Sequence, residues 1–155
     1  MGATVGEINR NDYTTELGEF LLVFNATENL LNDIVSHLLE RLHKKDRYPE
    51  DMFDRRLWIL ELICEAFKPM HAPDFEKLRE LNRTRNELAH GHMRTNPNTG
   101  EVDIVKAKDC SWGKGRKITP DRIRIASSLA KACYKDLDAM TPYIWFAHTP
   151  PKVVW

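Results

Sequence analysis

The chain has 155 residues, of which 42% are hydrophobic and 30% are charged. This length and composition are typical of a single globular domain that folds without a disulfide or structural metal, and they exclude an intrinsically disordered chain. Lys plus Arg and Asp plus Glu both number 23, so the net charge is zero. Any affinity for nucleic acid must therefore come from a local basic patch.

The sequence predicts neither a membrane span nor a secretion signal. No apolar run approaches the roughly 18 residues of a membrane span, and the polar N-terminal segment lacks the apolar stretch of a signal peptide. The three cysteines, Cys64, Cys110 and Cys133, are far apart and form no CxxC pair, which is typical of free thiols in a reducing compartment. We expect one cytoplasmic domain over residues 1–155, with residues 1–13 and 149–155 loosely held and no membrane partner.

The first predicted helix covers Leu17 to His43. Its apolar residues recur at spacings of three and four: Leu17, Phe20, Leu21, Phe24, Leu31, Ile34, Val35, Leu38 and Leu42. Further apolar residues lie off this stripe, namely Leu22, Val23, Leu30 and Leu39. We therefore expect a second side of this helix to be covered, by another subunit of a homodimer.

Two shorter helices follow. One is predicted over Asp51 to Phe67, with an inner face of Phe53, Leu57, Leu60, Cys64 and Phe67. The next begins near Pro73 and Asp74, because proline suits a first helical turn and aspartate suits its positive end. Gly91 is the expected left-handed C-cap of this third helix.

The pattern then changes from helical spacing to alternation. Val102 and Ile104 alternate with acidic residues, and the turn-forming segment NPNTG at 96–100 precedes them, which predicts a β-hairpin. The final helix begins with Thr119 as N-cap and Pro120 as its first residue. Its inner face comprises Ile123, Ala126, Leu129, Ala130, Cys133, Leu137 and Met140. The predicted fold is all-α, a bundle of four to five helices with a β-hairpin between the third and fourth.

Polar and basic residues crowd the end of the third helix, in the segment RTRNELAHGH at 83–92. His90 shares a helical face with Asn86 and Arg83, whereas Arg85 and His90 are about 140° apart around an ideal helix. Basic side chains at a helix C-terminus are often only partners of the last carbonyl groups or of the helix dipole. Arg83 and Arg85 could also pair with Glu80 or Glu87 on the surface.

The stretch RNELAHG at 85–91 resembles the Arg-x4–6-His signature of the HEPN superfamily, whose members are small α bundles. The resemblance implies a metal-independent ribonuclease, often a toxin or phage-defence effector, that acts as a homodimer with the two motifs meeting at the interface. Other HEPN members have lost catalysis and serve as binding modules. Arg85, Asn86 and His90 match the signature, and Arg83 also fits as its arginine. Some HEPN toxins carry a tyrosine two residues after the histidine that a partner antitoxin modifies; His92 stands there, so we do not expect that control.

The residue types suit RNA cleavage, in which the 2′-OH is the nucleophile. The unperturbed pKa of a histidine such as His90, about 6.5, suits acid–base work at neutral pH. A guanidinium such as that of Arg85 matches phosphate oxygens bidentately, and Asn86 could orient the imidazole or donate to the phosphate. A two-fold dimer would bring two such sets together and supply both acid and base. The expected product is a 2′,3′-cyclic phosphate, with no cofactor.

Further substrate contacts are expected from Arg83, His92, Lys114, Arg116 and Lys117. The last three lie in a basic segment with Trp112 that could bind single-stranded RNA by charge and stacking, although a solvated basic loop explains the same pattern. His90 and His92 have no third ligand at a suitable spacing, so no metal site is expected.

The predicted function is thus a homodimeric endoribonuclease of HEPN type, with RNA and a possible antitoxin or regulatory protein as partners. The alternative is a catalytically inactive HEPN dimer that binds nucleotide, RNA or a partner protein. A third possibility is an enzyme subunit or regulator unrelated to RNA.

Overall fold

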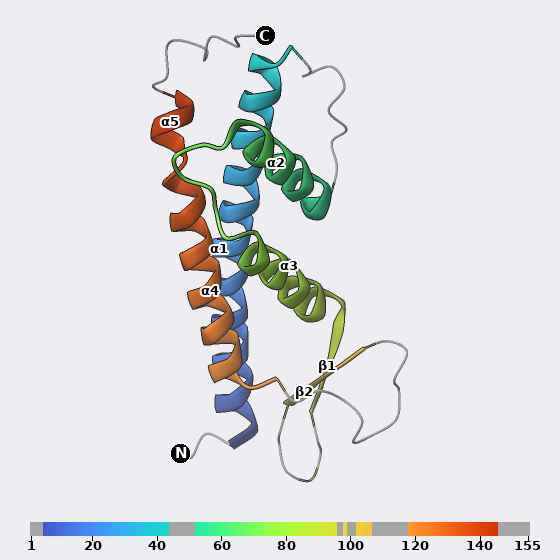
Figure 1. The fold of residues 1–155 in the computed structure, drawn as a ribbon. Coiled ribbons are helices and arrows are strands. Elements are labelled where there is room, and N and C mark those ends of the chain that lie inside the picture. Colours follow the sequence, from blue (N-terminus) through green and yellow to red (C-terminus); the bar gives the residue numbers. More distant parts are fainter. Residues whose placement is uncertain (1–4, 44–51, 96–97, 99–101, 107–117, 146–155) are drawn as a thin grey trace.

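The computed structural model describes residues 5–43, 52–95, 98, 102–106 and 118–145. Its helices are α1 (Val5–Arg41), α2 (Phe53–Phe67), α3 (Phe75–His90), α4 (Pro120–Asp138) and α5 (Thr141–Trp145), and strands β1 (Gly91–Thr95) and β2 (Val102–Lys106) lie between α3 and α4. Figure 1 shows α1 and α4 side by side along the length of the molecule, with α2 and α3 on one side of this pair. The described part of the chain is mostly helical, as the sequence predicted.

Helices α1 and α4 run parallel and make the most extensive contact between elements. Ion pairs connect them in the same order along both helices: Arg124 Nε donates to Glu16 Oε1 at 2.6 Å, and Lys131 Nζ donates to Glu19 Oε1 at 2.5 Å. Thr27 is fully buried, and its hydroxyl donates to the carbonyl oxygen four residues earlier at 2.8 Å. A polar side chain is thus satisfied inside the core.

The N-cap predicted for α4 is confirmed, and Asp74, expected only near the positive end of α3, is the N-cap of that helix. Asp74 Oδ1 accepts a hydrogen bond from the backbone N–H of Lys77 at 3.1 Å. Thr119 Oγ1 accepts one from the backbone N–H of Arg122 at 3.3 Å, and Pro120 follows as the first helical residue. Each cap satisfies one of the amide groups that a helix start leaves unpaired.

The predicted inner face of α2 is confirmed except at its end. Its buried residues are Phe53, Leu57, Leu60 and Cys64, whereas Phe67 is 50% exposed. Phe67 is the last residue of α2, and the chain turns away immediately afterwards because Lys68 adopts a left-handed conformation with φ 45°.

Two expectations about helix ends were wrong. Helix α1 begins at Val5 rather than near Leu17, so residues 5–13 are not a loose segment. Tyr13 is buried, and its hydroxyl donates to the carbonyl oxygen of Ile118, a partner distant in sequence that a local pattern cannot show. Gly91 is not a left-handed cap: its φ of −80° and ψ of 139° are extended, because the chain passes directly from α3 into β1.

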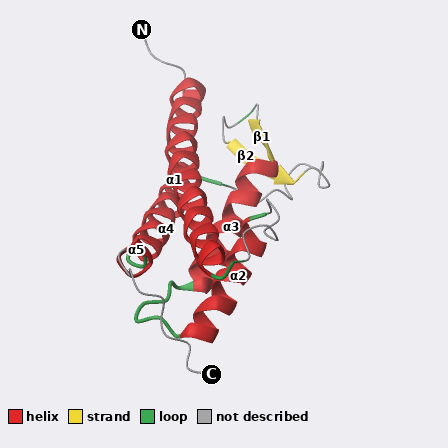
Figure 2. Ribbon diagram, turned by 90° about the horizontal axis from the view of Figure 1, so that it is seen from above, coloured by secondary structure: helices red, strands yellow, loops and turns green. Residues whose placement is uncertain are grey.

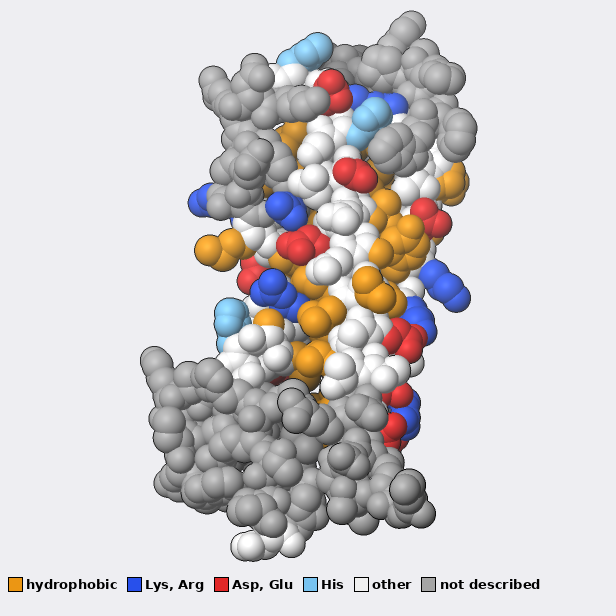
Figure 3. All heavy atoms as spheres, turned by 180° about the vertical axis from the view of Figure 1, so that it is seen from behind, with side chains coloured by type: hydrophobic (Ala, Val, Ile, Leu, Met, Phe, Trp, Pro, Cys, Tyr) orange, Lys and Arg blue, Asp and Glu red, His pale blue; other side chains and the backbone are white. Residues whose placement is uncertain are grey.

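The second apolar side of α1 is covered mostly within the chain itself. Val23, Leu30 and Leu39 pack, partly buried, against the core, whereas Leu22 is 74% exposed. Figure 3 shows hydrophobic side chains in the middle of the rear face, with charged side chains among and beside them. The described helices thus account for most of the apolar surplus that the sequence attributed to a second subunit.

Strands β1 and β2 pair antiparallel, with Gly91 opposite Lys106 and Thr95 opposite Val102. Figure 2 shows them beside the C-terminal end of α3. Most of the predicted turn at 96–100 and all of residues 149–155 lie outside the described residues. None of the described helices combines the length and the apolar composition needed to cross a membrane.

Candidate functional site

Arg85 lies on the packed face of α3. The buried residues on this helix are Leu78, Leu81, Asn82 and Leu88, and Arg85 is itself partly buried. Its guanidinium carbon lies 5.5 Å from the centroid of the Phe24 ring of α1, within the range of a cation–π contact. The Phe24 ring also contacts the ring of Phe20, with centroids 6.2 Å apart, and that of Phe53 of α2, which stacks on it with centroids 5.5 Å apart. Arg85 therefore adds to a contact that joins α1, α2 and α3.

Asn86 connects Arg85 to the outer side of α3. Arg85 Nη1 donates to Asn86 Oδ1 at 3.0 Å. Asn86 and His90 are both exposed and are four residues apart, which makes them neighbours on the helix surface. The guanidinium of Arg85 is thus fixed from two sides, by an aromatic ring and by the amide next to His90.

Arg83 and His90 lie on one exposed stripe of the same helix. Both are exposed, and a spacing of seven residues returns to the same side of an α-helix after about two turns. The structure therefore brings Arg83, Asn86 and His90 to the outer surface and holds Arg85 on the packed side. This agrees with the angular separation that the sequence predicted for Arg85 and His90.

The side chains of the remaining predicted substrate contacts lie outside the described residues. His92 lies in β1, two residues beyond the end of α3, but its side chain lies outside the described residues. Lys114, Arg116 and Lys117, together with Trp112, also lie outside them. Their contribution to RNA binding stays a prediction.

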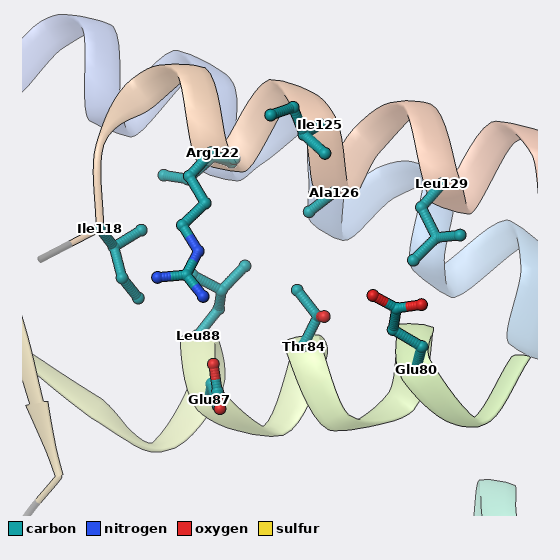
Figure 4. Close-up of a pocket in the computed structure, with 10 residues that line it drawn as sticks. Glu80, Thr84, Glu87, Leu88, Ile118, Arg122, Ile125, Ala126 and Leu129 are labelled. Carbon is teal, nitrogen blue, oxygen red and sulfur yellow. The ribbon is translucent and has the colours of Figure 1, made fainter. Parts of the chain in front are cut away.

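A cavity of about 130 Å³ lies between α3 and α4, beside the stripe that carries Arg83 and His90. Figure 4 shows Glu80 and Thr84 pointing from α3 toward α4, and Arg122 reaching from α4 toward Leu88 and the Glu87 end of α3. The cavity is lined by Glu80, Thr84, Glu87, Leu88, Ile118, Arg122, Ile123, Ile125, Ala126 and Leu129. It combines aliphatic walls with charged groups of both signs.

Two structural supports of the site were missed by the sequence analysis. Phe24 was assigned only to the core, because nothing local indicates which side chain covers a buried ring. Asn82 is 7% exposed, and its Nδ2 donates to Asp54 Oδ1 of α2 at 2.8 Å. An asparagine inside the apolar stripe of α3 was a usable signal, since a buried amide needs a partner.

The described thiols and histidines indicate no second reactive centre. Burial raises the pKa values of Cys64 and Cys133 to about 11, so neither is an activated thiolate. His71 Nε2 lies 3.0 Å from Asp136 Oδ1 and ties the α2–α3 connection to α4. Within the described segments, no three His, Cys, Asp or Glu side chains gather into a group that could hold a metal ion.

Comparison with known proteins gives no assignment. No protein-family model matches the chain, and no curated protein or solved structure is significantly similar to it.

Proposed function

We propose that this chain is a metal-independent endoribonuclease of HEPN type, with a HEPN-like helical bundle, and that it acts as a homodimeric toxin or phage-defence effector. The observation that carries the proposal is the arrangement at the end of α3: a partly buried Arg85 bound to Asn86, which neighbours the exposed His90. The resemblance of this segment to the Arg-x4–6-His signature gives the reaction class.

In this proposal His90 moves the proton and Arg85 stabilises the charge on the phosphate. A guanidinium already held by Asn86 and Phe24 needs little reorganisation in the transition state, which is the condition for strong electrostatic stabilisation. Arg83 binds a substrate phosphate from the exposed stripe. Cleavage by the 2′-OH releases the 5′-oxygen and leaves a 2′,3′-cyclic phosphate.

A second copy of the chain completes the site. One His90 cannot be the base for the 2′-OH and the acid for the 5′-oxygen in one concerted step, and a two-fold axis near the end of α3 supplies two histidines. The exposure of His90, Arg83 and Asn86 supports this placement. Light scattering at micromolar concentration should give a dimer, and a monomer would contradict the composite site.

The test is cleavage of single-stranded RNA in EDTA by the wild type and by His90→Ala. We expect the wild type to cut and the variant to lose about 10²–10⁴-fold in rate, the usual contribution of a general acid–base group. The variant should keep its dimeric state and melting temperature, because His90 is exposed and leaves no cavity. Wild-type rates from a folded His90→Ala dimer would remove the enzyme proposal.

One observation favours the alternative, a non-catalytic HEPN dimer that binds nucleotide, RNA or a protein. The guanidinium of Arg85 covers Phe24, so packing alone gives this arginine a structural role. Retained RNA binding without cleavage by the purified wild type would support this alternative.

A further inference from the structure

The cavity and the proposed active site share one stripe of α3. Glu80, Arg83, Glu87 and His90 follow one another at spacings of three, four and three residues, which keeps them on the same side of a helix. Glu80 and Glu87 line the cavity between α3 and α4, while Arg83 and His90 are exposed beside it. Glu87 lies one turn from both Arg83 and His90, and side chains at this spacing have Cβ atoms roughly 5–6 Å apart. A ligand whose phosphate contacts Arg83 and His90 can therefore extend a neighbouring group to Glu87.

The size and walls of the cavity suit one flat ring system. Its volume of about 130 Å³ is well below the roughly 300–1,000 Å³ of sites that enclose drug-sized ligands. Ile125 and Leu129 of α4 supply aliphatic wall, and Leu88 of α3 supplies more at the end of the cavity near Arg122. Aliphatic surfaces can hold the two faces of a nucleobase, and sequence-specific recognition of single-stranded RNA reads such splayed bases by their edges.

The charged groups of the cavity can distinguish the bases by the hydrogen-bond donors and acceptors that each base presents. A carboxylate accepts two hydrogen bonds from neighbouring N–H groups, and the N1–H and N2–H₂ groups of guanine supply that pair. Adenine, cytosine and uracil each present a ring nitrogen or carbonyl acceptor within this edge, which a carboxylate repels. A guanidinium such as that of Arg122 donates to the O6 and N7 acceptors of guanine. Glu87 and Arg122 already make interactions in the structure, so a base would replace contacts that each now makes.

We propose that the cavity between α3 and α4 is a base-recognition pocket that takes a guanine adjacent to the scissile phosphate, with Glu87 accepting from its Watson–Crick edge. The proposal rests on the proposed ribonuclease function, because it assumes that Arg83 binds a substrate phosphate beside His90. It adds the base specificity of the reaction.

The test measures binding of 3′-GMP, 3′-AMP, 3′-CMP and 3′-UMP to the full chain by calorimetry, alongside cleavage of RNA oligonucleotides that carry each base at one position. We expect 3′-GMP to bind at least tenfold more tightly than the other three and Glu87→Gln to weaken its binding about ten- to hundredfold. Glu65→Gln is the matched control: it removes the same charge from an exposed position on α2 and should leave all four affinities unchanged.

The outcomes separate this proposal from the ribonuclease itself. If RNA is cleaved with no guanine preference, or if Glu87→Gln weakens the binding of all four nucleotides equally, the pocket proposal is wrong. The ribonuclease proposal is then unaffected. If the protein binds 3′-GMP selectively, Glu87→Gln abolishes that selectivity and no RNA is cleaved, the pocket proposal is supported and the ribonuclease proposal is wrong. Should Glu87→Gln be unstable, Glu80→Gln removes the charge of the other cavity carboxylate and should weaken 3′-GMP binding. Equal binding of all four nucleotides by the wild type overturns the proposal whatever either variant does.

Discussion

The guanidinium carbon of Arg85 lies 5.5 Å from the centroid of the Phe24 ring, and Phe24 is 1% exposed. An arginine of the motif therefore covers part of the hydrophobic core that joins α1, α2 and α3. This contact gives Arg85 a structural contribution that Arg83, exposed on the outer stripe of α3, does not share.

Arg85→Ala should lower the free energy of unfolding by about 0.5–2 kcal/mol, the range of a cation–π contact from exposed to desolvated settings. Arg83→Ala removes the same side chain from an exposed position on the same helix and should stay within about 0.5 kcal/mol of the wild type. Urea denaturation of the three proteins measures both values. Equal stability of the two variants would show that the ring contact contributes nothing.

Arg85→Lys separates the structural and catalytic contributions of Arg85. Lysine keeps the positive charge and a long aliphatic chain but lacks the planar fork that binds phosphate oxygens bidentately. We expect near wild-type stability and a loss of about 10²–10³-fold in kcat, the usual cost of removing one transition-state donor. RNA cleavage under saturating substrate measures the loss. A lysine variant with full kcat would move the catalytic assignment to Arg83.

Asn82→Ala should destabilise the protein by about 0.5–1.5 kcal/mol, the usual net contribution of one hydrogen bond, because it removes the partly buried bond to the exposed carboxylate of Asp54. Asn86→Ala is the matched control, since it changes the same residue type one turn later at an exposed position. Thermal unfolding measures both. A smaller loss of stability in Asn82→Ala than in Asn86→Ala would contradict the assigned packing of Asn82.

Cys64 and Cys133 should resist thiol reagents in the folded protein. Their pKa values are raised to about 11, chiefly by burial, so at pH 8 both are protonated and only the thiolate reacts. Reaction with a chromogenic disulfide should therefore be slow for these two until urea unfolds the chain. Single Cys→Ser variants assign each reaction, and rates equal to those of free cysteine at either position would contradict the burial.

Replacing Lys114, Arg116 and Lys117 together with alanine should weaken RNA binding and reduce its salt dependence. For single-stranded RNA, every phosphate that the protein no longer neutralises lowers the slope of log K against log salt by about 0.7. Binding of a labelled RNA to an otherwise inactive His90→Ala background at several salt concentrations measures the slope. An unchanged slope would make this segment an ordinary solvated loop.

The sequence alone predicted α2, α3, α4 and most of α1, together with the polar segment that forms the candidate site. Apolar residues that recur at every third or fourth position predicted these helices. A helix that packs on one side needs this spacing, because it matches the number of residues in a helical turn. Asp74 marked one helix start because a carboxylate suits the positive end of a helix, and Thr119 marked another as an N-cap that satisfies an amide group of the first turn. The polar segment at the end of α3 could also be recognised from the sequence, because its residues are adjacent in the chain.

Only the tertiary structure decided which side chains meet across elements. Tyr13 in the first turns of α1 bonds to Ile118, and Arg85 lies against Phe24. Both partners are distant in sequence, so no local pattern encodes them. The cavity beside Glu87 exists because α4 passes over α3. The sequence could place Arg85 and His90 on different faces of one helix, but the packing of that helix determined which of the two faces is buried.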